Sequence, residues 1–268
     1  MLAAQRCTED RPLPQRSRAA MALRVAVPLL SAEEGLHREA TLLDRVRTTA
    51  ISGGVVFWRS QKALSVPRVV ESRQHFGAIR AAMAKAGWPV VVRATGGDVL
   101  PLTPGLLNIG LCFAHPGSSA FGIAEAYKLL CEPLIEVLGA WGIAAVCGRT
   151  PGALCDGEYN LVVEGRKLAG TAQRWRHAAD GSGRMAILAE ATIFGDDDLR
   201  VQVAAAEEFY RLSGMVAGLK VDRHVTLAEL LPGPYAELGG SGLLEAMAAE
   251  IAQAFRRRFG WPACVPSD

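Results

Sequence analysis

The chain has 268 residues, half of them apolar, so it is long enough to bury one substantial hydrophobic core. Charged residues make up 21% and the net charge is +2, which gives no electrostatic reason to expect nucleic-acid binding. No apolar run reaches the roughly 18 residues that span a membrane, and no spacing of Cys and His suits a metal site.

The N-terminal segment of 23 residues is polar, interrupted by proline, and without the apolar core of a signal peptide. We therefore expect residues 1–23 to be a disordered leader, with Met21 as an alternative start, and residues 24–268 to form a single domain. A chain without a signal peptide is expected in the cytoplasm, where its six cysteines stay reduced.

Helix and strand patterns alternate in the first half. Ser31, followed by two acids and by apolar residues at helical spacing, predicts a capped amphipathic helix over 31–50. Further on, the patterns predict a strand at 53–60, a helix at 72–88, and strands at 89–97 and 105–114. Residues 118–142 predict a long helix that Pro133 bends or interrupts.

A meander of strands follows. Residues 159–163 and 166–176 predict a hairpin around a turn at 164–165, and residues 184–194 predict a third strand. The remainder is expected to be helical, ending in a helix over 242–260 whose three closing arginines suit a helix C-terminus. These patterns indicate an α+β fold, a mixed or antiparallel sheet with helices packed on it.

The loop RATGGD, which begins at Arg93, has the composition of a ligand-binding loop. Gly96 and Gly97 allow a ligand to approach the backbone closely, and their N–H groups can hold an anion. Arg93 offers a planar cation that suits a carboxylate or a phosphate. The alternative is an ordinary tight turn beside a surface arginine.

Cys155 differs from Cys112 and Cys131, because it lies in the polar, glycine-flanked loop GALCDGEY rather than in an apolar run. A nearby cation would favour a thiolate nucleophile there, and Lys167 and Arg149 are candidates for that cation. Small residues beside Lys167 leave room for a bound chain along the strand. An idle loop cysteine and a solvated lysine are the alternatives.

Two segments, taken together, resemble a known family. VVRATGGDVLPLTPGLLNIGL, residues 91–111, looks like the arginine and glycine signature of the lipoate–protein ligase and octanoyltransferase superfamily. YNLVVEGRKLAGTAQRWR, residues 159–176, looks like that superfamily's second motif, and the order and spacing agree. The resemblance spans roughly residues 30–260 and implies a single cofactor-transferase domain related to biotin protein ligases.

The resemblance also implies roles for individual residues. Lys167 would contact the acyl carbonyl or an activated phosphate, and Arg93, Gly96 and Gly97 would line the acyl pocket. Cys155 falls in the loop where cysteine-dependent members of the ligase-like group carry their nucleophile. The remaining residues that the motifs imply for substrate binding are Asn108, Gly170, Thr171 and Ala172.

Two departures from the motifs bear on how the acyl group is activated. Asp98 replaces a glycine, and Asn160 replaces the usual aspartate. A carboxylate at Asp98 would repel an adenylate phosphate, which favours thioester chemistry. We therefore expect a member of the cysteine-dependent octanoyltransferase-like branch: Cys155 takes an octanoyl or lipoyl group as a thioester and passes it to an acceptor lysine as an amide, without metal or cofactor.

The resemblance names partners as well. The donor would be acyl carrier protein or acylated H protein, and the acceptor a lipoyl domain of a 2-oxoacid dehydrogenase or the glycine-cleavage H protein; no nucleic acid or membrane is expected. Two alternatives stay open. One is an ATP- and Mg²⁺-dependent lipoate–protein ligase that forms lipoyl-adenylate, and the other is a non-catalytic lipoyl-binding module. The sequence leaves open the preference for octanoyl or lipoyl and the oligomeric state.

Overall fold

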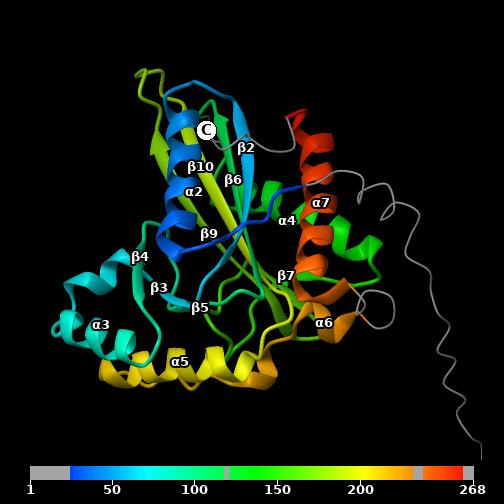
Figure 1. The fold of residues 1–268 in the computed structure, drawn as a ribbon. Coiled ribbons are helices and arrows are strands. Elements are labelled where there is room, and N and C mark those ends of the chain that lie inside the picture. Colours follow the sequence, from blue (N-terminus) through cyan, green and yellow to red (C-terminus); the bar gives the residue numbers. More distant parts are fainter. Residues whose placement is uncertain (1–24, 118–120, 232–237, 262–268) are drawn as a thin grey trace, which may run out of the picture.

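The computed structural model describes residues 25–117, 121–231 and 238–261, and it has the expected α+β fold (Figure 1). The expected leader at 1–23 lies outside the described residues, so the division of the chain into leader and domain stays a prediction. In the described ranges, no helix combines the length and the apolar character that crossing a membrane requires.

Seven strands form the larger sheet, in the order β1-β2-β6-β10-β9-β8-β7. β1 runs parallel to β2, and the other neighbours are antiparallel. This arrangement confirms the predicted mixed sheet, hairpin and third strand. The bounds are β1 (Leu29–Leu30), β2 (Gly53–Ser60), β6 (Leu106–His115), β7 (Val146–Gly148), β8 (Asn160–Val163), β9 (Arg166–His177) and β10 (Met185–Phe194).

The hairpin between β8 and β9 turns where the sequence predicts it. Glu164 and Gly165 have φ angles of 49° and 74°, the left-handed pair that a two-residue hairpin turn requires. A glycine meets this requirement without steric cost. The turn brings Lys167, near the start of β9, back toward the loop that precedes β8.

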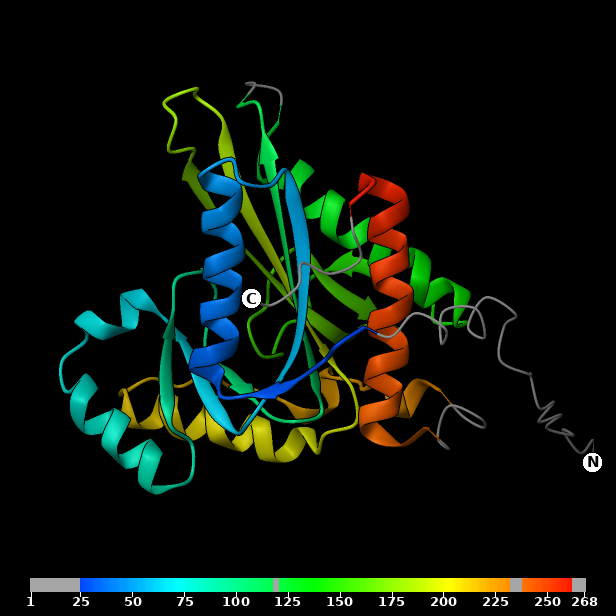
Figure 2. The same cartoon turned by 45° about the horizontal axis from the view of Figure 1, so that its top comes forward.

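Helices cover both faces of this sheet (Figures 1 and 2). α4 (Ile123–Ala140) and α7 (Gly239–Phe259) pack on one face, and α2 (Ala32–Arg47) packs on the other. The predicted interruption at Pro133 is wrong, since α4 continues through it. Pro133 is itself buried, and its ring nitrogen cannot donate the backbone hydrogen bond of that turn.

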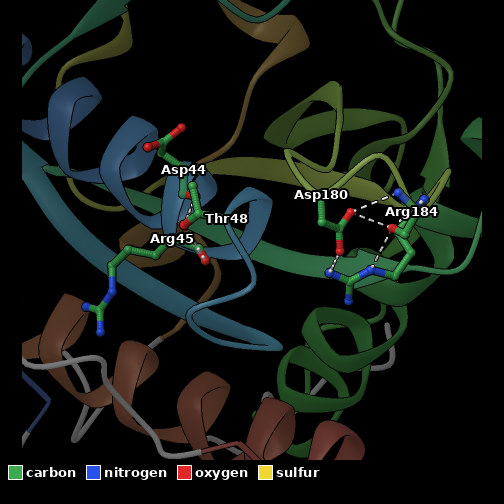
Figure 3. Close-up of polar contacts among 6 residues, drawn as sticks. Asp44, Arg45, Thr48, Asp180 and Arg184 are labelled. Carbon is green, nitrogen blue, oxygen red and sulfur yellow. Dashed lines mark hydrogen bonds and ion pairs between the residues drawn. The ribbon is translucent and has the colours of Figure 1, made fainter.

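Both ends of α2 are held by side chains. At its start the Ser31 hydroxyl accepts the N–H of Glu34 at 3.2 Å, and the Glu34 carboxylate accepts the N–H of Ser31 at 2.9 Å, which confirms the predicted cap. At its end the Thr48 hydroxyl donates to the Asp44 carbonyl at 2.9 Å (Figure 3). The turn between β9 and β10 lies beside this end, because the N–H of Ala179 donates to the Arg47 carbonyl.

A second, three-stranded sheet in the order β4-β3-β5 was not predicted as a separate unit. α3 and α5 lie beside this sheet (Figure 2). Side chains of these elements belong to a second hydrophobic core. The elements of this part and the short connecting helices are β3 (Ala63–Pro67), β4 (Val90–Arg93), β5 (Leu100–Leu102), η1 (Arg68–Ser72), α3 (Phe76–Lys85), α5 (Leu199–Leu212), η2 (Val221–Arg223) and α6 (Leu227–Leu230). The predicted helix at 72–88 is thus shorter than expected.

Candidate active site

Two loops that are far apart in sequence meet at the Cys155 sulfur. The backbone N–H of Asp98 donates to Cys155 Sγ at 3.3 Å across a separation of 57 residues. Gly97 is equally close, because a Cβ at this position would lie 3.0 Å from the same sulfur. A backbone donor aimed at sulfur stabilises a thiolate. The structure therefore joins the predicted glycine loop to the predicted nucleophile.

The backbone of Cys155 is itself unusual. Its φ of 51° lies in the left-handed region, which a residue with a Cβ rarely adopts. Such a conformation persists only where surrounding contacts hold it. The Cys155 carbonyl supplies two of these contacts, since it accepts a hydrogen bond from Lys167 Nζ and one from Asn160 Nδ2, each at 2.8 Å.

Lys167 is the cation beside this loop. Its side chain is fully buried, and Nζ donates to the Leu154 carbonyl as well as to the Cys155 carbonyl. Burial lowers the pKa of Lys167 to about 8, although the nearby Cys155 and Asp156 act in the opposite direction. The other cation considered, Arg149, is exposed and paired with Asp156 at 3.5 Å. Of the two candidate cations, Lys167 is therefore the one that contacts the backbone of Cys155.

Sequence reasoning missed His224, which supports the same loop from behind. The N–H of Leu154 donates to His224 Nε2 at 2.8 Å, so the ring proton lies on Nδ1, which donates to the Lys220 carbonyl at 3.0 Å. Burial, followed by the charge of Lys167, lowers the pKa of His224 to about 4. No local sequence signal could have found this residue, because its partner lies 70 positions away.

Replacing His224 by glutamine is expected to reduce the acid sensitivity of the fold. Between pH 6.5 and 4 the unfolded chain binds a proton that the folded protein excludes, so the wild type loses stability as the pH falls through that window. The loss attributable to this group is up to about 3 kcal/mol. Urea unfolding of both proteins at about pH 7 and pH 4.5 measures the difference. Equal losses in the two proteins would contradict the assignment.

Arg93 lies within the site, but its guanidinium is occupied by the protein itself. It donates to the Ser65 carbonyl and to the Gly96 carbonyl, each at 2.9 Å, and also to the Asp98 carbonyl. Burial lowers the pKa of Arg93 despite nearby acidic groups. In this arrangement Arg93 shapes the glycine loop and holds the Asp98 N–H on the Cys155 side.

A cavity of about 60 Å³ joins these groups. A Cβ at Gly170 would lie 3.1 Å from Lys167 Nζ, so the small residue there makes room for the lysine. Asn108 accepts a hydrogen bond from the Thr192 hydroxyl at 3.0 Å, which fixes its side chain in the wall. The residues predicted for catalysis or binding that line this cavity are Arg93, Gly96, Asn108, Cys155, Lys167, Gly170, Thr171 and Ala172. Gly97 touches the sulfur instead.

The same cavity is also lined by a buried pair of acids that sequence reasoning missed. Burial, and then the charge of Glu190, raise the pKa of Glu39 well above its usual range, while burial raises that of Glu190. Trp58 Nε1 donates to Glu39 Oε1 at 2.8 Å. Burial and the neighbouring carboxylate thus both favour the neutral form of Glu39. In the described part of the chain no three acids, cysteines or histidines are grouped as metal ligands.

The chain is similar to known proteins of one kind. The family model described as lipoyl protein ligase A/B catalytic domain matches residues 31–183. An octanoyl-GcvH:protein N-octanoyltransferase of Kyrpidia tusciae is 39% identical over 150 residues, which are 55% of this chain and 51% of that protein. The match thus spans about half the length of that relative. An uncharacterised protein of Cupriavidus necator is 30% identical over 243 residues, 84% of this chain and 90% of that protein.

A solved structure shares the fold. The crystal structure of lipoate-protein ligase A bound with ATP superposes with a TM-score of 0.60 at 16% identity, covering 92% of this chain and 87% of that one. At this identity the likeness concerns the arrangement of helices and strands. It confirms the expected biotin/lipoate ligase-like fold.

Proposed function

Because the chain belongs to the lipoyl protein ligase A/B catalytic domain family, we propose that it transfers an octanoyl group to a protein lysine through a thioester on Cys155. The observation that carries the proposal is the Asp98 N–H aimed at Cys155 Sγ in a cavity that also holds Lys167. The name of the Kyrpidia tusciae relative gives octanoyl-GcvH and protein as the two parties. We extend both to this chain.

In the first step the Cys155 thiolate attacks the acyl carbonyl carbon. A C–S bond forms, and the carbonyl oxygen becomes an oxyanion, which the ammonium of Lys167 stabilises from the wall of the same cavity. The bond between the acyl carbon and the donor then breaks, and the leaving group of the donor takes a proton from the Lys167 ammonium, which leaves Lys167 neutral for the second step. The positive charge of Lys167 is already held at the loop before substrate arrives, so it needs little reorganisation.

In the second step the amine of the acceptor lysine attacks the acyl-enzyme, an amide forms, and Cys155 leaves as a thiolate. The incoming amine must lose a proton. Because burial brings the pKa of Lys167 to about 8, this side chain can release and take up a proton near neutral pH. Lys167 thus combines a charge for the oxyanion with a proton relay for the amine.

Two features favour this route over activation by ATP. The donors of the Arg93 guanidinium bind backbone carbonyls, so it is not free to meet a nucleotide phosphate in this arrangement. The Asp98 carboxylate belongs to the cavity lining and would repel such a phosphate. An ATP- and Mg²⁺-dependent ligase activity is the alternative that the experiment below distinguishes from thioester transfer. Acyl carrier protein as donor and lipoyl domains of 2-oxoacid dehydrogenases as acceptors remain predictions.

The test is an intact mass measurement after mixing the purified protein with octanoyl-GcvH in the absence of ATP. We expect a mass gain of one octanoyl group, and trypsin should place it on the peptide of residues 150–166, which contains Cys155 as its only cysteine. Cys155→Ala should abolish the gain. Cys147→Ala, which removes an exposed thiol outside the cavity, should keep it.

The other outcomes separate the alternatives. An adduct that survives in Cys155→Ala would contradict the proposed nucleophile. Transfer that occurs only with free octanoate or lipoate, ATP and Mg²⁺ would establish the ligase. Tight lipoate binding without transfer under either condition would establish the binding module.

A further inference from the structure

A second pair of thiols lies apart from the acyl site. Cys131 is on α4, and Cys147 is on the edge strand β7. The antiparallel register places Cys147 opposite Leu161 of β8, and partners across a strand pair share a face of the sheet. Leu161 belongs to the hydrophobic core that contains α4 and Cys131. Cys147 therefore faces the helix that carries Cys131.

The two thiols are close enough to interact, because each shifts the pKa of the other. Cys131 is buried, and its Sγ lies 3.7 Å from the Tyr159 carbonyl, whereas Cys147 is exposed at the edge of the sheet. The sulfur of Cys147 is thus accessible to a small reagent, whereas the sulfur of Cys131 is shielded from solvent.

We propose that Cys131 and Cys147 form a peroxide-oxidisable dithiol, in which Cys147 is attacked first and Cys131 resolves it. This site is independent of the proposed acyl transfer. The interaction between the two thiols lowers the pKa of Cys147 to about 7 and, together with burial, raises that of Cys131. A thiolate is the form that reacts with peroxide, so the exposed member of the pair is the reactive one.

The chemistry balances with a hydroperoxide as the oxidant. The Cys147 thiolate attacks one peroxide oxygen, an S–O bond forms, the O–O bond breaks, and the departing hydroxide takes up a proton as water. The sulfur of Cys131 then attacks the sulfenic sulfur of Cys147. The S–S bond forms, the S–O bond breaks, and the hydroxyl leaves as water with the proton of Cys131. Two thiols are oxidised and one hydrogen peroxide is reduced.

The other described cysteines lack this arrangement. Cys112 is fully buried, and burial together with Glu39 and Glu190 raises the pKa of its thiol well above the usual value. Its hydrogen bond goes to the Glu39 carbonyl. The sulfur of Cys155 accepts a hydrogen bond from the Asp98 N–H, and it interacts electrostatically with Lys167. Cys112 is thus a matched control: it is a free thiol of the same sheet without a thiol partner.

The pair can be tested on the intact protein by peptide mapping. Trypsin cleaves after Lys128 and after Arg149, which gives a peptide of residues 129–149 that contains both Cys131 and Cys147. After brief treatment with hydrogen peroxide and blocking with N-ethylmaleimide, we expect this peptide to be unblocked and to have lost two hydrogen atoms. Dithiothreitol should restore two blockable thiols. The peptide that contains Cys112 should stay reduced throughout.

Three variants complete the experiment. Cys147→Ser should prevent the loss of hydrogen in the peptide, and Cys131→Ser should leave Cys147 to proceed to sulfinic acid. Cys112→Ser should oxidise like the wild type. The oxidised wild type should also melt at a higher temperature than the reduced form, because the disulfide closes a loop in the unfolded chain.

The proposal would be overturned by either of two results. In the first, peroxide converts Cys147 of the wild type to sulfinic acid while Cys131 remains blockable. In the second, Cys147 is found joined to a cysteine of another peptide. Each would show that Cys131 is not the resolving thiol.

Discussion

Octanoyl transfer by Cys155→Ala should fall at least about 10³-fold below the wild type, because Cys155 supplies the one thiol among the residues that line the cavity. The Asp98 N–H would then lack its sulfur acceptor, but Lys167 Nζ and Asn160 Nδ2 would still donate to the backbone carbonyl of residue 155. The assay follows octanoyl-amide formation on an acceptor protein from octanoyl-GcvH, under single-turnover conditions. The change is small in volume, so the fold should be retained.

Two comparisons make that result specific. Cys155→Ser keeps a nucleophilic atom of similar size but with a much higher pKa, so it should also fail to form the acyl-enzyme at neutral pH. Cys112→Ala changes a buried cysteine outside the cavity and should retain transfer if the protein is folded. Transfer by Cys155→Ala within tenfold of the wild type would mean that the acyl group moves directly between its partners.

Lys167→Met is expected to lower the rate of acyl-enzyme formation by about 10² to 10³, the loss seen when one donor to an oxyanion is removed. Methionine fills the buried space of the lysine stem but cannot donate to the Leu154 and Cys155 carbonyls. The rate of the octanoyl mass gain measures the first step alone. A loss confined to the second step would restrict Lys167 to proton transfer.

The pH dependence of this lysine gives an independent readout. The folded protein holds the lysine with a pKa of about 8, against 10.5 for an unperturbed lysine. Between these values the unfolded chain binds the extra proton, so the wild type gains stability as the pH rises through that window. Lys167→Met should lack this contribution. Urea unfolding at about pH 8 and pH 10 compares the two, and parallel curves would contradict the buried, shifted lysine.

Local features could be predicted because residues close in sequence determine them. The Ser31 cap depends on Glu34, three residues later, and the turn at Glu164 and Gly165 depends on φ angles that those two positions adopt themselves. The hairpin then brings Lys167 back toward the loop of Cys155. This is why a pattern of residues was enough to predict the helix and the hairpin.

Other features depended on which segments pack against each other. The three-stranded sheet was missed because its short strands pair across loops and a helix, and an interruption at Pro133 was expected because the packing of α4 on the sheet was unknown. The acid pair of Glu39 and Glu190 exists because a helix and a strand bury the two side chains together. The spacing of residues along the sequence does not predict that these two distant side chains are buried together.

The sequence by itself determined the family motifs, the local elements and the residue types of the site. Only the tertiary structure decided that the Asp98 N–H donates to Cys155 Sγ, that Arg93 binds its own loop, and that His224 accepts a hydrogen bond from Leu154, next to Cys155. The physical reason is that hydrogen-bond direction and burial depend on the relative positions of distant segments. Strand register and the packing of the two hydrophobic cores set those positions, and both depend on segments throughout the fold.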